Sequence, residues 1–142
     1  MTDIPKIKAN NQEIQQVFLN IISNARYSLN KKYPDIGDDK KLAITTQIFS
    51  IKKTPFVRIT FLDHGLGISK TVLNLVTDPF FSTKPQGEGT GLGLSISHGI
   101  VKNHGGRLLF KSVVGEYTKV MVDLPIGSNP SFDTQPEVSG AR

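Results

Sequence analysis

The sequence contains no cysteine, so it can form neither a disulfide framework nor a thiolate metal site. That absence is compatible with a reducing compartment, and we expect a cytoplasmic location. No apolar run approaches the ~20 residues that a membrane-spanning helix needs, and no secretory signal opens the chain. We therefore expect no membrane contact by this chain; an anchor of the intact protein would lie in parts outside it.

Acidic residues are outnumbered, 12 against 17 basic residues, which gives a net charge of +5. An excess of this size suits a polyanionic ligand without identifying one. The lysines gather in predicted loops without interleaved aromatic residues or a known nucleic-acid motif, which favours solvated charge over a nucleic-acid patch. We therefore expect no nucleic-acid partner.

Hydrophobic periodicity predicts an α+β domain, a two-layer sandwich of helices on a sheet. The expected elements are a strand over Ile4–Ala9, a helix over Gln12–Leu29, a hairpin of Leu42–Ile51 with Pro55–Leu62, a short helix over Lys70–Val76, a helix over Gly91–Asn103, and a hairpin of Arg107–Val114 with Thr118–Leu124. We expect one domain over residues 1–125. Residues 126–142 are poor in hydrophobic residues, and we expect a disordered tail there.

Four glycines stand at alternate positions from Gly87 to Gly93, directly ahead of a helical pattern. Glycine lets backbone N–H groups turn toward a ligand, and a helix start favours a phosphate chain. The spacing fits neither the P-loop, since no Lys follows at the required place, nor the dinucleotide fingerprint, which must follow a strand. A low-complexity linker is disfavoured because a helix with an apolar face begins inside the run.

Two asparagines, Asn20 and Asn24, lie four residues apart on the first long helix and therefore share one face beside the apolar stripe. Side-chain carbonyl oxygens are hard ligands that suit Mg²⁺ together with water and substrate phosphate. Bracing of neighbouring backbone explains the pair equally well from the sequence alone.

Asp63 follows an apolar strand and precedes Gly65, Gly67 and Ile68. A carboxylate there can accept a hydrogen bond from an amine such as that of adenine, although a simple strand-ending turn is the alternative. In the glycine-rich loop, Thr90 and Lys84 offer a hydroxyl and a cation to phosphates. The neighbouring Phe80 and Phe81 fit a lid anchor or the core equally well.

In this order and spacing, the segments resemble the ATP-binding domain of sensor histidine kinases. Asn20–Ala25 resembles the asparagine box, Asp63–Ile68 the first glycine box, Asp78–Lys84 the phenylalanine box and Gly89–Leu94 the second glycine box. The resemblance covers about residues 4 to 125. It implies a Bergerat-type fold, a mixed sheet of about five strands backed by three helices, with ATP held beneath a lid of roughly residues 69–90.

The resemblance also implies roles for the motif residues. Asn24 would bind Mg²⁺ with support from Asn20, and Asp63 would accept the adenine amine beside Gly65, Gly67 and Ile68. Lys84 and Thr90 would steady the transferred phosphate. The remaining expected nucleotide contacts are Phe80, Gly89, Gly91, Leu92 and Gly93. Together, Asn20, Asn24 and Lys84 would be the catalytic residues.

The implied activity is transfer of the ATP γ-phosphoryl group to a histidine. Related ATPases of this fold place a glutamate where Asn20 stands; because an amide cannot activate water, a kinase is favoured over a hydrolase. A degenerate nucleotide-binding switch stays open, since Tyr27 occupies a place that is often basic and Arg26 stands one residue earlier. None of the three histidines has the phosphoacceptor context, so we expect a monomeric catalytic domain. Its partners would be a histidine-bearing dimerisation domain and a response regulator.

Overall fold

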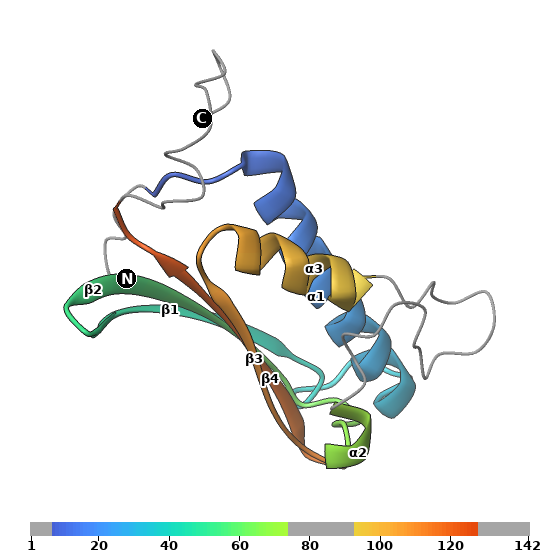
Figure 1. Cartoon of the computed structure of the whole chain (residues 1–142). Coiled ribbons are helices and arrows are strands. Elements are labelled where there is room, and N and C mark those ends of the chain that lie inside the picture. The colour runs from blue at the N-terminus through green and yellow to red at the C-terminus, as the bar shows by residue number, and fades with distance from the viewer. Residues whose placement is uncertain (1–6, 74–92, 128–142) are drawn as a thin grey trace.

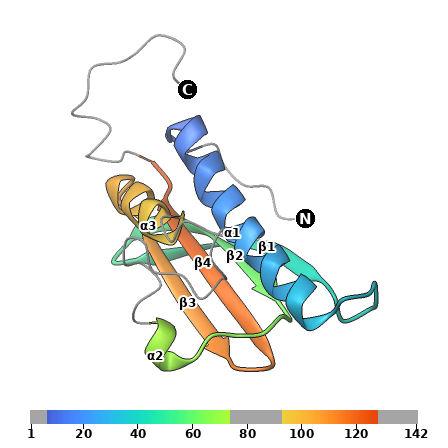
Figure 2. The same ribbon diagram turned by 90° about the vertical axis from the view of Figure 1, so that its right-hand side faces the viewer.

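The computed structural model describes residues 7–73 and 93–127 as two layers, with helices on one face of a twisted sheet (Figure 1). The elements in chain order are α1 (Asn11–Lys32), β1 (Leu42–Ile51), β2 (Thr54–Asp63), α2 (Lys70–Leu73), α3 (Gly93–Asn103), β3 (Arg107–Val113) and β4 (Tyr117–Pro125). Helices α1 and α3 pack side by side across the sheet (Figure 2). The predicted α+β architecture is confirmed.

The sheet departs from the expected mixed arrangement of about five strands. The described residues form four strands in the order β1-β2-β4-β3, and every neighbouring pair is antiparallel. The strand expected over Ile4–Ala9 is not formed by residues 7–9, and residues 4–6 lie outside the described part. Ile7 is partly buried and packs against the core, and the Asn10 N–H donates to the His104 side chain. Side-chain contacts thus help to hold this segment, in which residues 7–9 form no strand.

Helix α1 begins at Asn11, one residue before the predicted Gln12, because the Asn10 side chain caps it by accepting from the Glu13 N–H at 3.0 Å. Its buried residues recur at intervals of four along one face: Val17, Ile21, Ala25 and Leu29. The helix runs three residues past the predicted end at Leu29. Lys31 and Lys32 occupy its last turn, where positive charge interacts favourably with the helix dipole.

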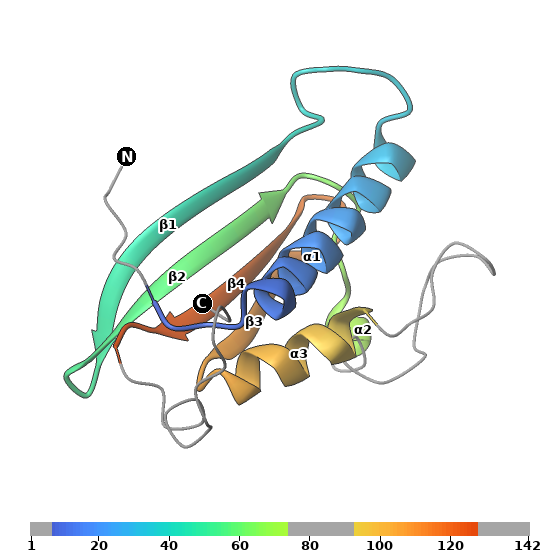
Figure 3. The ribbon, with the colours of Figure 1, turned by 90° about the horizontal axis from the view of Figure 1, so that it is seen from above.

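The core forms between α1, α3 and the helix-facing side of the three strands β2, β4 and β3. Its buried members are Val17, Ile21, Val57, Phe61, Val101, Leu108, Val120, Val122 and Leu124. The Phe18 and Phe61 rings meet with centroids 5.6 Å apart. Seen from above, β1 lies at the sheet edge beside the helices rather than beneath them (Figure 3).

His104 joins the end of α3 to the start of α1. Its ring is almost fully buried, at 1% exposure. Nδ1 donates to the Ile100 carbonyl at 2.8 Å, and Nε2 accepts the Asn10 N–H at 3.1 Å. The two helices are thereby fixed to each other at the end of the sheet where β4 finishes.

An ion cluster centred on a buried aspartate occupies the opposite face of the sheet from the helices. Asp123 is fully buried and accepts from Arg58 at 2.7 and 2.9 Å and from Arg107 at 3.0 Å. The three residues are direct register partners on β2, β4 and β3. Arg58 also lies over the Phe49 ring, 4.8 Å from its centroid. This cluster was not predicted from the sequence.

Ile126, the first residue of the expected tail, still packs against the core. The Ile126 N–H donates to the Pro55 carbonyl at 2.9 Å, and its side chain contacts the core. Residues 128–142 lie outside the described part, so the expectation of a disordered tail stays a prediction.

Candidate functional site

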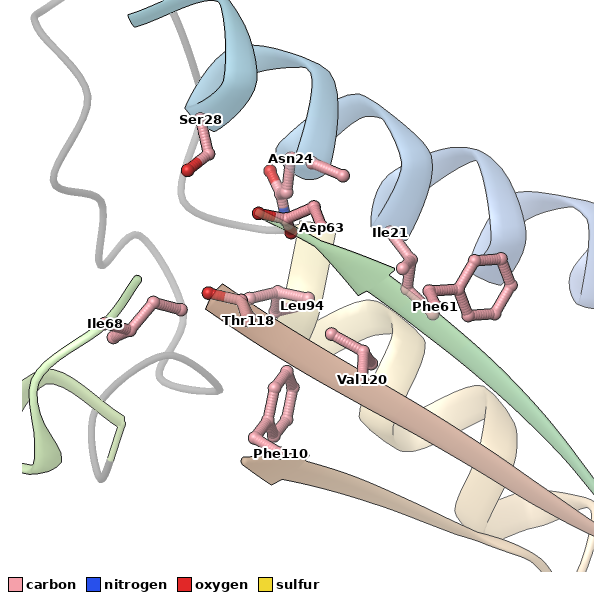
Figure 4. Close-up of a pocket in the computed structure, with 11 residues that line it drawn as sticks. Ile21, Asn24, Ser28, Phe61, Asp63, Ile68, Leu94, Phe110, Thr118 and Val120 are labelled. Carbon is pink, nitrogen blue, oxygen red and sulfur yellow. The ribbon is translucent and has the colours of Figure 1, made fainter. Parts of the chain in front are cut away.

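A pocket that is open to solvent lies between α1 and the ends of β2 and β4 (Figure 4). Apolar side chains make most of its walls, including Ile21, Phe61, Ile68, Leu94, Phe110 and Val120. The polar groups among the described lining residues are few: Asn24, Ser28, Asp63 and Thr118. A flat apolar body with a small polar edge would fit such a site.

One face of α1 forms the upper wall of this pocket. Ile21, Asn24, Ala25 and Ser28 all line it, at the spacing that places residues on a single helix face. The structure thus brings Asn24 together with Asp63 and Ile68, three of the residues singled out from the sequence (Figure 4). The parts they play remain predictions.

Asp63 ends β2 inside the pocket and is only 5% exposed. Its Oδ1 accepts the Gly65 N–H at 2.9 Å. Burial raises the pKa of the Asp63 carboxyl, an effect that the Gly65 hydrogen bond and the positive charge of His64 and Lys32 oppose only in part. A partly desolvated carboxylate of this kind is a strong acceptor for a ligand amine.

The two glycines of this loop are required by the protein's own packing. A Cβ at Gly65 would collide with the Ser28 hydroxyl and lie 2.8 Å from the Asp63 Oδ1. Gly67 has a φ of 72°, and a Cβ there would collide with the Val113 carbonyl. Glycine is therefore needed at both positions before any ligand is considered.

Hydroxyl groups that the sequence analysis missed hold the same loop. The Leu66 N–H donates to Ser28 Oγ at 2.7 Å, and the Ile68 N–H donates to Ser112 Oγ at 2.8 Å. The Gly115 N–H donates to the Leu66 carbonyl at 2.7 Å. The loop is thus attached to α1 on one side and to the β3–β4 hairpin on the other.

Thr118 was also missed, although it lies at the centre of the site. It is 6% exposed and sits directly across from Asp63 in the β2–β4 register. Its hydroxyl contacts that of Ser112 at 3.0 Å. The available signal was a hydroxyl residue at the core-facing end of a strand whose alternate positions, Val120 and Val122, are apolar.

Asn20 connects α1 to the first turns of α3. Its amide nitrogen donates to the Gly93 carbonyl and to Ser97 Oγ, both at 3.0 Å, and its oxygen accepts from Gln16 Nε2 at 2.9 Å. Gly93 therefore enters the site's framework through its backbone. These bonds correspond to the bracing alternative considered for this asparagine.

The remaining predicted site residues fall in the segment 74–92, which is outside the described residues: Phe80, Lys84, Gly89, Thr90, Gly91 and Leu92. Within residues 7–73 and 93–127, no three His, Cys, Asp or Glu side chains gather as a metal site. In those same ranges, no helix combines the length and apolar character needed to cross a membrane.

Comparison with known proteins found a family match and many similar sequences. The model of the histidine kinase-, DNA gyrase B- and HSP90-like ATPases matches residues 9–128. The two-component sensor PprA of Pseudomonas aeruginosa is 32% identical over 122 residues, which is 86% of this chain and 13% of that protein. Sporulation kinase E of Bacillus subtilis is 32% identical over 127 residues, 89% of this chain and 16% of that protein.

The sensor histidine kinase ZraS of Escherichia coli K12 is 32% identical over 123 residues, 87% of this chain and 24% of that protein. The chain therefore spans less than a quarter of the length of these relatives.

Proposed function

Because this chain belongs to the family of histidine kinase-, DNA gyrase B- and HSP90-like ATPases and is a catalytic domain of the sensor histidine kinase type, we propose that it transfers the ATP γ-phosphoryl group to a histidine. The acceptor would lie on a dimerisation domain, and a response regulator would receive the phosphoryl group next. We propose a cytoplasmic, monomeric domain over residues 1–125, followed by a tail over 126–142.

The observation that carries this proposal is the buried carboxylate of Asp63 inside an apolar pocket. The apolar walls suit the faces of a purine ring, and the carboxylate suits its exocyclic amine. Asn24 lines the same pocket from α1, and α3 begins at its border with Gly93 and Leu94. The base would therefore bind on the floor, and the phosphates would extend toward the two helices.

Magnesium fits the residues present at the helix end of the pocket. A bound Mg²⁺ would supply charge neutralisation for the phosphates. Asn24 would hold the ion through its amide oxygen, the kind of hard ligand that Mg²⁺ accepts alongside water and phosphate. Asn20 would support this end by positioning the start of α3, since its own amide is bonded there. Lys84 and Thr90 would steady the transferred group.

Asn20 also favours phosphoryl transfer over hydrolysis. A general base must accept a proton from the attacking water, which an amide cannot do near neutral pH. Here the Asn20 oxygen accepts from Gln16 and its nitrogen donates to α3. The side chain is thus placed for positioning, and the reaction would depend on orientation and charge stabilisation.

The test is a titration of the 142-residue chain with a non-hydrolysable ATP analogue, with and without Mg²⁺, followed by incubation with labelled ATP and a histidine-bearing dimerisation domain. We expect binding that Mg²⁺ strengthens and label on the histidine of the added domain. Steady phosphate release without transfer would instead identify a hydrolase. Binding with neither reaction would identify a nucleotide-binding switch.

Replacing Asn24 by alanine should remove most of the Mg²⁺ enhancement while leaving base recognition in place. The loss of one oxygen ligand should weaken Mg²⁺-dependent binding by about tenfold, the effect of a single polar contact to a charge. Calorimetric titration with and without Mg²⁺ measures it. Ser23→Ala, at the exposed neighbouring position, is the matched control. An Asn24→Ala variant with an unchanged Mg²⁺ response would refute the metal assignment.

A further inference from the structure

We propose that Ser112 determines which purine the pocket accepts, by fixing the direction of the Thr118 hydroxyl. This inference rests on the proposed function, since it requires a purine nucleotide on the pocket floor. It assigns the base selectivity to a hydroxyl relay across β3 and β4. Ser112 is in this view a positioning residue, and Thr118 is the residue that would contact the base.

The hydrogen-bond distances around Ser112 leave one assignment for its proton. Ser112 Oγ lies 2.6 Å from the Tyr117 carbonyl oxygen, which can only accept. The serine must therefore donate to it. Ser112 Oγ in turn receives the Ile68 N–H at 2.8 Å, which occupies one of its two acceptor positions.

The Thr118 hydroxyl can therefore take only one part in its hydrogen bond with Ser112. The two hydroxyl oxygens are 3.0 Å apart, and one of them must supply the proton between them. Because the Ser112 proton is committed to Tyr117, Thr118 donates. The Thr118 oxygen consequently keeps only lone pairs for a ligand in the pocket that it lines.

The pocket floor therefore presents two acceptors side by side. Asp63 and Thr118 are direct register partners on β2 and β4, and both line the pocket (Figure 4). The 6-amino group of adenine offers two N–H donors to such a pair. A 6-oxo purine, such as hypoxanthine, places an acceptor at the same position and would leave lone pairs facing lone pairs. The arrangement should select the 6-amino base.

The test compares ATP with inosine triphosphate, which differs in the 6-position group and the N1 hydrogen that accompanies it. In the Ser112→Ala variant, the Thr118 hydroxyl is released and can turn to donate to a 6-oxo group. We expect the ratio of ATP to inosine triphosphate affinity, measured by calorimetric titration, to fall roughly three- to tenfold, the effect of one hydrogen bond. Ser112→Ala also removes the hydrogen bond from the Ile68 N–H. The resulting loosening of the loop should weaken the binding of both nucleotides equally, so it should not change the ratio of their affinities.

Two further variants complete the experiment. Ser112→Thr keeps a hydroxyl and should restore the wild-type ratio. Thr118→Val removes the acceptor itself and should lower the affinity ratio as Ser112→Ala does. If circular dichroism shows that Ser112→Ala does not fold, Thr118→Val provides the test of the inference. Ser50→Ala, at an exposed position of β1, is the control.

An equal loss for both nucleotides in Ser112→Ala or, if that variant is unfolded, in Thr118→Val would show a structural role only and overturn the inference. Equal affinity of wild type for ATP and inosine triphosphate would overturn it too, without touching the proposed function. A wild-type chain that binds neither nucleotide would overturn the proposed function and this inference together.

Discussion

Replacing Asp63 by asparagine should weaken ATP binding by about 10- to 100-fold, the worth of a hydrogen bond to a buried charged group. The variant keeps an oxygen that can accept the Gly65 N–H, so the loop geometry should survive. The substitution removes the negative charge and replaces one carboxylate oxygen by an NH₂ group. That group is a donor, so it cannot accept a hydrogen bond from the amine of the base. Calorimetric titration with the non-hydrolysable analogue measures the loss.

The same substitution should stabilise the ligand-free protein at neutral pH. Burial raises the pKa of Asp63 above its ordinary value of 3.8, so the native state binds this proton more tightly than the unfolded chain does. Its contribution to the free energy of unfolding therefore falls as the pH rises from below 3.8 through the raised pKa. Asparagine avoids that loss. The Tm of Asp63→Asn should exceed that of wild type at pH 7, and the gap should close on acidification.

Asp35→Asn removes a charge at an exposed loop position and is the control for both measurements. If Asp63→Asn bound ATP as tightly as wild type, Asp63 would have only the structural role of ending β2. A gap in Tm that widened toward acid pH would mean that the Asp63 carboxylate is stabilised, rather than penalised, by its surroundings. The two measurements together separate the contribution of this carboxylate to ATP binding from its effect on the stability of the fold.

Removing Asp123 should destabilise the fold by about 3 kcal/mol, the lower end of the range for breaking a buried ion pair. Asp123→Ala leaves Arg58 and Arg107 without their shared carboxylate. The lower end applies because the two side chains are 22% and 49% exposed and can be partly solvated. Urea unfolding monitored by circular dichroism gives the free energy.

Nucleotide binding provides the second measurement on Asp123→Ala. The residue lies on the sheet face away from the pocket, so the folded fraction of the variant should bind ATP as wild type does. Asp38→Ala, in the exposed loop after α1, is the matched control for loss of one aspartate. A loss of stability no greater than that of Asp38→Ala would show that the cluster contributes little net free energy.

The periodic elements could be predicted from the sequence because each is encoded locally. The spacing of Val17, Ile21 and Ala25 predicts the buried face of α1, and both hairpins follow from apolar strands bounded by turn residues. The prediction of a strand over Ile4–Ala9 is wrong for residues 7–9, where Ile7 is partly buried and packs against the core in a segment that forms no strand. An apolar segment of that length carries no signal that distinguishes strand pairing from simple burial.

The site could be predicted in part, for a related reason. Asn24 and Asp63 stand in segments whose order and spacing resemble a known family, and the structure places both at one pocket. Ser112 and Thr118 are brought together by the register of β3 and β4, which the sequence alone does not reveal. The Asp123 cluster escaped notice likewise, because its partners belong to three strands that only the sheet order brings together.

The bonding of His104 bears on phosphorus chemistry as well as on helix packing. An imidazole attacks a phosphoryl group with the lone pair of its unprotonated nitrogen, which must reach the phosphorus atom. In His104 that nitrogen is Nε2, whose lone pair already receives the Asn10 N–H inside the protein. The other nitrogen carries the proton given to Ile100. This histidine is thus a poor nucleophile in the folded domain, protected from phosphorylation by the same two bonds that join α1 to α3.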